Sequence, residues 1–244
     1  MVHEKELLIK TSDRKLLNGI LRGDPQKPLV LLVHGFGGQM NDVLQYVSAR
    51  IFERNGFASL RFNFFSASRN GRKSRDCTLA QNGHDINAVI SFAQTELGAV
   101  KIFAACHSFG FPSLLSAKPA GLSAVVSWDG SIVTEALIKN LTVLSEEKGY
   151  LFRFTYPLFA GEGMIEEAKK TCYEDLFTGY ATPTLFTVSK KGQAFFEEEA
   201  RKMFVLAPKP KDIIFFENAR HGYTEEGAVE VLTKKTIKWF RKYC

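Results

Sequence analysis

The chain of 244 residues is 45% hydrophobic and 24% charged, an ordinary composition for a globular protein with room for one α/β domain and a sizeable core. Its formal net charge of +6 is spread along the sequence, without the one-sided basic stripe of a nucleic-acid-binding helix, so we expect no nucleic-acid partner. No apolar run has the length of a transmembrane helix, and we expect no signal peptide at the charged N-terminus.

Apolar runs bounded by turn residues predict strands that alternate with helices along most of the chain. The predicted strands span residues 4–10, 15–21, 29–33, 58–64, 101–105, 123–128, 184–188 and 211–217. The predicted helices span residues 41–55, 79–97, 132–144, 164–171, 194–204 and 225–242, and another helix follows residue 110 directly. This alternation predicts an α/β fold with a mostly parallel sheet of about eight strands and helices on both of its faces.

Cysteine usage bears on the redox environment of the protein. The four cysteines have no CxxC spacing and no metal-ligand residues nearby, so we expect no metal site, and we expect no cofactor. We predict free thiols and a cytoplasmic protein. The cysteines are Cys77, Cys106, Cys172 and Cys244.

Two stretches interrupt the predicted elements. Residues 66–77 are polar, basic and irregular, and we predict a solvated loop there. Alternatively, the basic residues of this loop receive an acidic substrate or an anionic acyl carrier; they are Arg69, Arg72, Lys73 and Arg75. Residues 130–182 carry helical patches and an aromatic section at residues 150–159.

The pentapeptide Cys106-His107-Ser108-Phe109-Gly110 places a serine at a tight turn between a predicted buried strand and a predicted helix. Such a turn pushes the serine hydroxyl out of the sheet, and the helix N-terminus behind it favours developing negative charge. Small residues are needed where the strand and the helix nearly touch, and Gly110 meets that need. A simpler alternative is that Ser108 serves only as a helix N-cap.

This pentapeptide resembles the nucleophile elbow of the α/β-hydrolase family, with Cys106 at the place of the first glycine of the G-x-S-x-G pattern. The resemblance covers about residues 15–243. It implies the α/β-hydrolase fold in a single domain of residues 1–244, with a small cap insertion at about 130–182 after the sixth strand. A fainter likeness to cinnamoyl (feruloyl) esterases rests on the residues around Arg61, on Gly71 and on residues 76–79.

The resemblance assigns the remaining parts of an acyl-transfer site. Ser108 corresponds to the nucleophile, and His221 follows the last predicted strand, where the family keeps its histidine base. The turn HGFGG at residues 34–38 resembles the family's oxyanion loop, so the backbone N–H groups of Phe36 and Phe109 are the expected oxyanion donors. His34 in this motif is expected to have a structural hydrogen-bonding role. A plain turn at HGFGG and a loop-capping histidine at His221 are the simpler alternatives.

The position of the carboxylate that would orient His221 departs from the usual family pattern. Most relatives place it after the strand predicted at 184–188, where this chain has SKKGQ and no carboxylate, and the glutamates at 197–199 read as a solvated helix face. Some lipases and dehalogenases carry the acid after the preceding strand, and Asp129 stands there. We therefore expect Asp129 to orient His221. A turn-forming role for Asp129 remains an alternative, as do the carboxylates of Glu162 and Asp175.

These residues together predict a serine hydrolase that cleaves a small-molecule carboxylic ester or thioester through an acyl-enzyme. The aromatic section suggests an apolar acyl or aromatic substrate portion, and the candidate substrate-binding residues are Tyr156, Phe159 and His107. His107 stands beside the nucleophile, and its side chain is expected to point away from it. A catalytically inactive relative that binds a ligand or partner, and a peptidase or C–C bond hydrolase, are the competing hypotheses.

Overall fold

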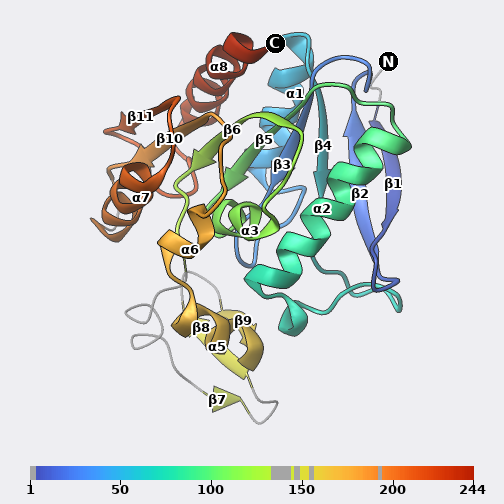
Figure 1. The fold of residues 1–244 in the computed structure, drawn as a ribbon, viewed down its shortest axis with the longest axis vertical. Coiled ribbons are helices and arrows are strands. Elements are labelled where there is room, and N and C mark those ends of the chain that lie inside the picture. The colour runs from blue at the N-terminus through green and yellow to red at the C-terminus, as the bar shows by residue number, and fades with distance from the viewer. Residues whose placement is uncertain (1–3, 133–143, 146–148, 154–156, 192–193) are drawn as a thin grey trace.

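The computed structural model describes residues 4–132, 144–145, 149–153, 157–191 and 194–244. The strands of its main sheet are β1 (Glu4–Lys10), β2 (Leu16–Arg22), β3 (Leu29–Val33), β4 (Ala58–Phe62), β5 (Ile102–His107), β6 (Leu122–Trp128), β10 (Thr184–Ser189) and β11 (Lys211–Phe216). Their order is β1-β2-β4-β3-β5-β6-β10-β11 (Figure 1). The β1–β2 and β2–β4 pairs are antiparallel and the other pairs are parallel. The predicted mostly parallel sheet of about eight strands is confirmed.

Helices cover both faces of this sheet (Figure 1). They are α1 (Val43–Arg54), α2 (Leu79–Thr95), α3 (Gly110–Ala117), α7 (Ala194–Leu206) and α8 (Ala228–Phe240). All five residues of β3 are buried, and they alternate between two core clusters, one with α2 and α3 and the other with α1 and α8. Because successive strand side chains point to opposite faces, the continuous apolar run of β3 requires helices on both sides.

The strand order reverses at β3, which has β4 on one side and β5 on the other. At such a point the loops that follow neighbouring parallel strands diverge and leave a crevice at the carboxyl edge of the sheet. The loop after β3 starts at His34, the turn after β5 contains Ser108, and Asp129 directly follows β6. The topology therefore brings all three segments to one edge.

The chain between β6 and β10 contains a second, three-stranded antiparallel sheet that the sequence analysis did not predict. Its strands are β7 (Leu144–Ser145), β8 (Gly149–Arg153) and β9 (Pro157–Gly161). Two helices follow, α5 (Glu162–Lys170) and α6 (Tyr173–Phe177); α5 matches the helix predicted at 164–171. The helix predicted at 132–144 falls mainly outside the described residues. These strands and α5 project beyond the main sheet, past one end of α2 (Figure 1).

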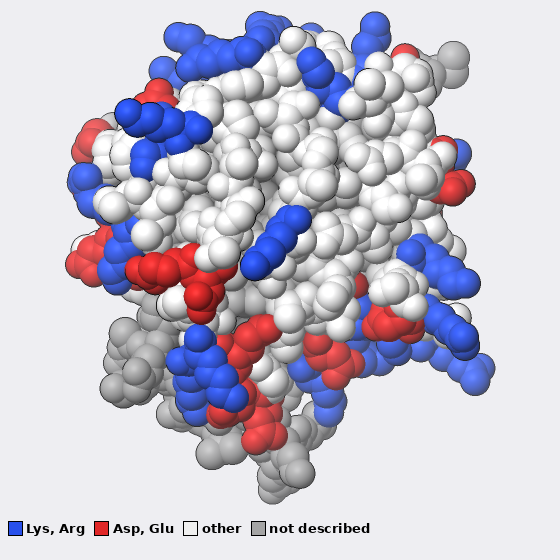
Figure 2. All heavy atoms as spheres, viewed as in Figure 1, with Lys and Arg blue, Asp and Glu red and all other residues white. Residues whose placement is uncertain are grey.

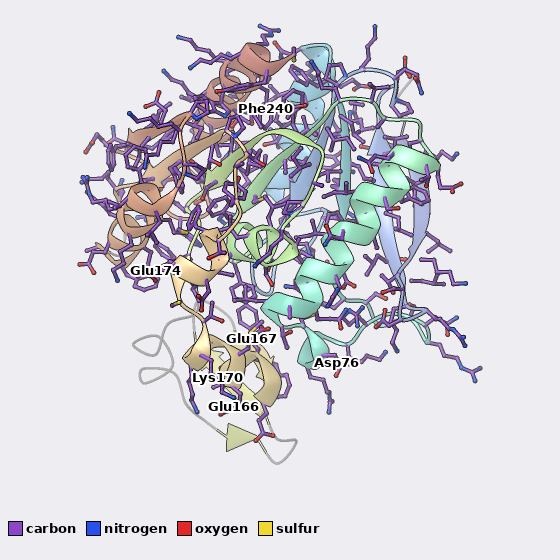
Figure 3. All side chains as sticks on the ribbon, viewed as in Figure 1. Asp76, Glu166, Glu167, Lys170, Glu174 and Phe240 are labelled. Carbon is purple, nitrogen blue, oxygen red and sulfur yellow. The ribbon has the colours of Figure 1, made fainter. Side chains whose placement is uncertain are left out.

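A carboxylate joins this insertion to the main body. Glu167 lies on α5 close to the start of α2 (Figure 3), and its two oxygens accept hydrogen bonds from the backbone N–H groups of Leu79 and Ala80, the latter at 2.9 Å. The first N–H groups of a helix lack partners within the helix, and the helix dipole favours a negative charge there. The side chain of Thr78 completes the cap by accepting from Gln81 N at 3.1 Å.

Loop 66–77 is only partly the solvated loop that we predicted. Lys and Arg side chains lie mostly toward the rim of the face that Figure 2 shows, with Asp and Glu among them, but Arg72 is 3% exposed. Its guanidinium forms ion pairs of 2.7 Å with Asp85 on α2 and 3.0 Å with Asp13 in the β1–β2 turn. The prediction of a solvated side chain is therefore wrong for Arg72. This residue ties the loop to the β1–β2 turn, which is distant in the sequence, and to the helix α2 that follows the loop.

The acidic run on α7 holds a second correction. Glu199 is 1% exposed and not part of a solvated face. Its carboxylate accepts a hydrogen bond from the hydroxyl of Tyr173 on α6 and pairs with Lys202 at 2.9 Å. The three consecutive glutamates look alike in the sequence, but only one side of α7 faces the protein, and Glu199 lies on that side.

Candidate functional site

The structure has the predicted strand, tight turn and helix around Ser108. β5 ends at His107, α3 begins at Gly110, and Ser108 lies between them with a φ of +53°, the left-handed region that non-glycine residues seldom adopt. The Ser108 N–H donates to the carbonyl of Trp128 over 2.8 Å and fixes the turn against the end of β6. A Cβ at Gly110 would lie 2.7 Å from the carbonyl oxygen of His34, so this close approach needs glycine.

The imidazole of His221 reaches the hydroxyl of Ser108. His221 lies in the loop between β11 and α8, and its Nε2 is 3.0 Å from Ser108 Oγ, a hydrogen-bonding distance. Two rings flank the imidazole. Phe196 of α7 stacks on it with a centroid distance of 3.7 Å and an interplanar angle of 7°, and the ring of His107 lies 4.7 Å away.

His107 binds the backbone of His221. Its Nε2–H donates to the His221 carbonyl oxygen over 2.8 Å. Because a carbonyl oxygen only accepts, the proton of this imidazole belongs on Nε2. Burial, and after it the nearby His221, lower the pKa of His107 to about 3. His107 is therefore a neutral group that holds the His221 backbone.

Asp129 is the carboxylate that the structure brings to His221. It is fully buried, has a φ of +49°, and its Oδ2 is 3.4 Å from His221 Nδ1. At this distance His221 Nδ1 makes no hydrogen bond, but the carboxylate lies close enough to pair with the imidazole when the ring is protonated. Asp129 also accepts from the backbone N–H of Ser189 at 2.7 Å and from the Ser189 hydroxyl at 2.5 Å.

The loop after β3 passes directly against Ser108. A Cβ at Gly35 would lie 2.8 Å from the Cβ of Ser108, so the backbone of this loop approaches the serine as closely as sterics allow. His34 holds the loop: its ring Nδ1 lies 2.8 Å from the Gly35 carbonyl oxygen, and its Nε2 accepts from the N–H of Phe64 over 3.2 Å. Burial lowers the pKa of His34 to about 4, which keeps the ring neutral in this hydrogen-bonding role.

A pocket of about 170 Å³ opens beside this loop, on the side of the two expected oxyanion donors. Phe36 and Phe109 line it, and their rings lie 6.3 Å apart in an edge-to-face arrangement. Phe159 of β9 and Met164 of α5 also line it, so the insertion forms part of the wall. The structure thus places the predicted Phe159 in a pocket, whereas Tyr156 lies outside the described residues.

No protein-family model matches the sequence, and no curated protein matches it. Solved structures do. Est1E from Butyrivibrio proteoclasticus, solved with ferulic acid bound, superposes with a TM-score of 0.81 at 18% sequence identity, covering 97% of this chain and 98% of that chain. The chain has the α/β-hydrolase fold.

Other structures of this fold agree with that assignment. The esterase domain of a Rhodothermus marinus protein has a TM-score of 0.74 at 18% identity and covers 99% of both chains. The dienelactone hydrolase from Anabaena variabilis has a TM-score of 0.71 at 15% identity, covering 99% of this chain and 98% of that chain. At these identities the likeness shows the fold, and the chemistry has to be argued from the site.

Within this α/β-hydrolase fold, the described residues offer no other carboxylate at His221. Glu162 begins α5 and Asp175 lies on α6, both exposed to solvent.

In the part of the chain that the structure describes, no group of three His, Cys, Asp or Glu residues is placed to hold a metal ion, and no helix has the length and apolarity to cross a membrane. The four cysteines are free thiols.

Two residues of this site escaped the sequence analysis. Ser189 ends β10, at the place where most α/β hydrolases continue to their acid, and it binds the Asp129 carboxylate from there. A hydroxyl at this position was visible in the sequence, although its partner was not. Phe196 gave no signal at all, because a phenylalanine on an amphipathic helix is usually a core residue.

Proposed function

We propose that the protein is a serine hydrolase that cleaves a carboxylic ester or thioester through an acyl-enzyme on Ser108. The observation that carries this proposal is the 3.0 Å distance between His221 Nε2 and Ser108 Oγ, which joins a nucleophile and a base from segments 113 residues apart. The buried Asp129 carboxylate on the other side of the imidazole supports the same reading.

The reaction starts when Ser108 Oγ attacks the substrate carbonyl carbon. His221 Nε2 takes the hydroxyl proton, and the Asp129 carboxylate, 3.4 Å from Nδ1, stabilises the imidazolium that forms. The N–H groups of Phe36 and Phe109 receive the oxyanion, and the N-terminus of α3 adds a favourable field there. Each such donor contributes on the order of 3 kcal/mol to lowering the barrier.

The second half of the reaction repeats these roles with water. His221 returns its proton to the leaving alcohol or thiol, and the acyl group remains on Ser108. His221 then removes a proton from water, which attacks the acyl-enzyme carbonyl and releases the acid. The Phe196 and His107 contacts hold the imidazole and its backbone in place throughout. That esterases are among the similar structures supports an ester substrate.

Hydrolysis of p-nitrophenyl acetate and p-nitrophenyl butyrate tests the proposal. We expect Ser108→Ala to lower kcat by at least about 10³-fold, while the control Ser91→Ala, at an exposed position on α2, leaves it unchanged. A fluorophosphonate should label Ser108 stoichiometrically. Equal rates for the wild type and Ser108→Ala, with no labelling, would overturn the proposal in favour of an inactive binding protein. Labelling without ester turnover would point to a peptidase or C–C bond hydrolase.

A further inference from the structure

The turn that carries His221 is closed by a buried tyrosine. The backbone N–H of Tyr223 donates to the carbonyl oxygen of Arg220 over 2.8 Å, so residues 220–223 form a tight turn with His221 as its second residue. Tyr223 is fully buried and has a φ of +51°, in the left-handed region that non-glycine residues seldom adopt. A backbone of this kind persists only where the surrounding contacts hold it. The contacts of the Tyr223 side chain therefore bear on the place of His221.

This side chain reaches from the turn to the strand β10. The hydroxyl of Tyr223 lies 3.1 Å from Thr187 Oγ1 in β10, and both residues are buried. The ring packs edge to face against Phe216, the last residue of β11, with the centroids 5.5 Å apart. Water does not replace a hydrogen bond that is lost at a buried place, so the remaining partner is left unpaired. The bond between Tyr223 and Thr187 therefore fixes the turn relative to β10.

Thr187 also holds the segment of the acid. Its backbone carbonyl oxygen accepts from the N–H of Asp129 over 3.0 Å, and its hydroxyl donates to the carbonyl oxygen of Ser127 over 3.1 Å. Because that hydroxyl has a single proton, Thr187 Oγ1 accepts and the phenol of Tyr223 donates. Burial, and after it the charge of the Asp129 carboxylate, raise the pKa of this phenol well above its usual value. The phenol therefore stays a donor throughout the neutral pH range.

We propose that the hydrogen bond between Tyr223 and Thr187 positions the imidazole of His221, an inference that rests on the proposed role of His221 as the base. One residue of β10 binds both the turn of the base and the segment of the acid. It thereby holds the imidazole 3.0 Å from Ser108 Oγ and 3.4 Å from Asp129 Oδ2. Tyr223 does not line the pocket. It is a positioning residue, which acts on the reaction through His221.

Conservative variants on both sides of the hydrogen bond test this role. Tyr223→Phe removes the hydroxyl and keeps the ring, and we expect kcat for p-nitrophenyl butyrate to fall about tenfold with KM unchanged, because a small displacement of a reacting group is costly in rate. Thr187→Val should lose about as much, whereas Thr187→Ser keeps the hydroxyl and should keep the wild-type kcat. The double variant Tyr223→Phe with Thr187→Val should be no slower than about twofold below either single variant, because both changes remove the same bond.

The chain offers a matched control on the same strand. The hydroxyl of Tyr180 lies 2.7 Å from Thr184 Oγ1, the first residue of β10, at the end of the strand away from the site. Tyr180→Phe thus also removes a hydrogen bond between a tyrosine and a threonine of β10, and we expect it to leave kcat unchanged. A wild-type kcat in Tyr223→Phe, or the same loss of kcat in Tyr180→Phe, would overturn the proposal.

Nuclear magnetic resonance of the imidazoles keeps this test separate from the test of catalysis. The ring of His221 stacks on Phe196 at 3.7 Å, so its signals respond to a small displacement whether or not any ester is cleaved. We expect Tyr223→Phe to shift the His221 ring signals, identified by their loss in His221→Gln, and Tyr180→Phe to leave them in place. Shifted signals in a protein without ester turnover would reject the hydrolase and retain the positioning role. Ester turnover with unchanged kcat and unchanged signals in Tyr223→Phe would do the reverse.

Discussion

The hydroxyl of Ser189 donates a hydrogen bond of 2.5 Å to Asp129 Oδ2, the same carboxylate oxygen that lies 3.4 Å from His221 Nδ1. The backbone N–H of Ser189 binds the other oxygen, Oδ1, at 2.7 Å. Both carboxylate oxygens are thus fixed from the end of β10. These contacts explain how the buried carboxylate of Asp129, which follows β6, keeps one orientation. The end of β10 supplies hydrogen-bond donors to this carboxylate and has no carboxylate of its own.

Replacing Ser189 with alanine should therefore slow catalysis without weakening substrate binding. Asp129 would lose a hydrogen bond to a charged group, which contributes about 1.5–3 kcal/mol, and with it one of the contacts that fix its orientation. We expect kcat for p-nitrophenyl butyrate to fall about tenfold with KM unchanged, because Ser189 does not line the pocket. A variant that loses stability but keeps the wild-type kcat would show that Ser189 acts on folding alone.

A second prediction concerns the ring that stacks on His221. Phe196→Ala removes the face-to-face contact at 3.7 Å and gives the imidazole room to rotate away from Ser108. We expect kcat to fall between about fivefold and fiftyfold, since misplacement by about 1 Å can cost a hundredfold. Phe195→Ala is the control, as it removes the adjacent phenylalanine of the same helix, whose ring contacts Phe196. Similar losses in the two variants would assign the effect to α7 as a whole.

The geometry of the site could be predicted from the sequence wherever a single short segment determines it. The turn at Ser108 could be predicted because a buried strand, a tight turn and a helix follow one another within a few residues. Sequence reasoning failed where a residue's role depends on a distant partner. Arg72 was read as solvated, although Asp85 and Asp13 bury it, and Glu199 was read as exposed, although Tyr173 binds it.

The same reason accounts for the missed three-stranded sheet. The pairing of β8 with β9 depends on register between two short segments, and their aromatic sequence fits a helix, a strand or a packed loop equally well. In the centre of the main sheet, by contrast, strands such as β3 and β5 each stand alone as an apolar run between turn signals. The fold of the main body could therefore be predicted from local patterns, and the insertion that forms part of the pocket wall could not.

Glu167 allows the attachment of that insertion to be tested. Glu167→Gln keeps the size of the side chain but replaces one accepting oxygen with an amide group that cannot accept from the start of α2. We expect a loss of about 1–2 kcal/mol in the free energy of unfolding in urea. Glu166→Gln is the matched control, because Glu166 is an exposed neighbour that pairs only with Lys169 among the described residues. Equal losses in both variants would contradict the capping role.

The two neutral histidines predict how stability depends on pH. Burial lowers the pKa of His34 to about 4 and that of His107 to about 3, below the ordinary value of 6.5. Between pH 6.5 and about 4 the unfolded chain therefore binds more protons than the folded protein, so stability falls as the pH falls through this window. Each histidine should remove about 2 kcal/mol between pH 7 and pH 5.

His107→Gln isolates one of these contributions. The glutamine amide can still donate to the His221 carbonyl, but it takes up no proton, so the loss of stability between pH 7 and pH 5 should shrink by about 2 kcal/mol relative to the wild type. Urea unfolding at the two pH values measures this difference. His84→Gln, at an exposed position on α2, should leave the pH dependence unchanged. If the stability of His107→Gln fell between pH 7 and pH 5 as much as that of the wild type, His107 would have to take up its proton in the folded protein as well. The assignment of a neutral His107 ring that donates to His221 would then be wrong.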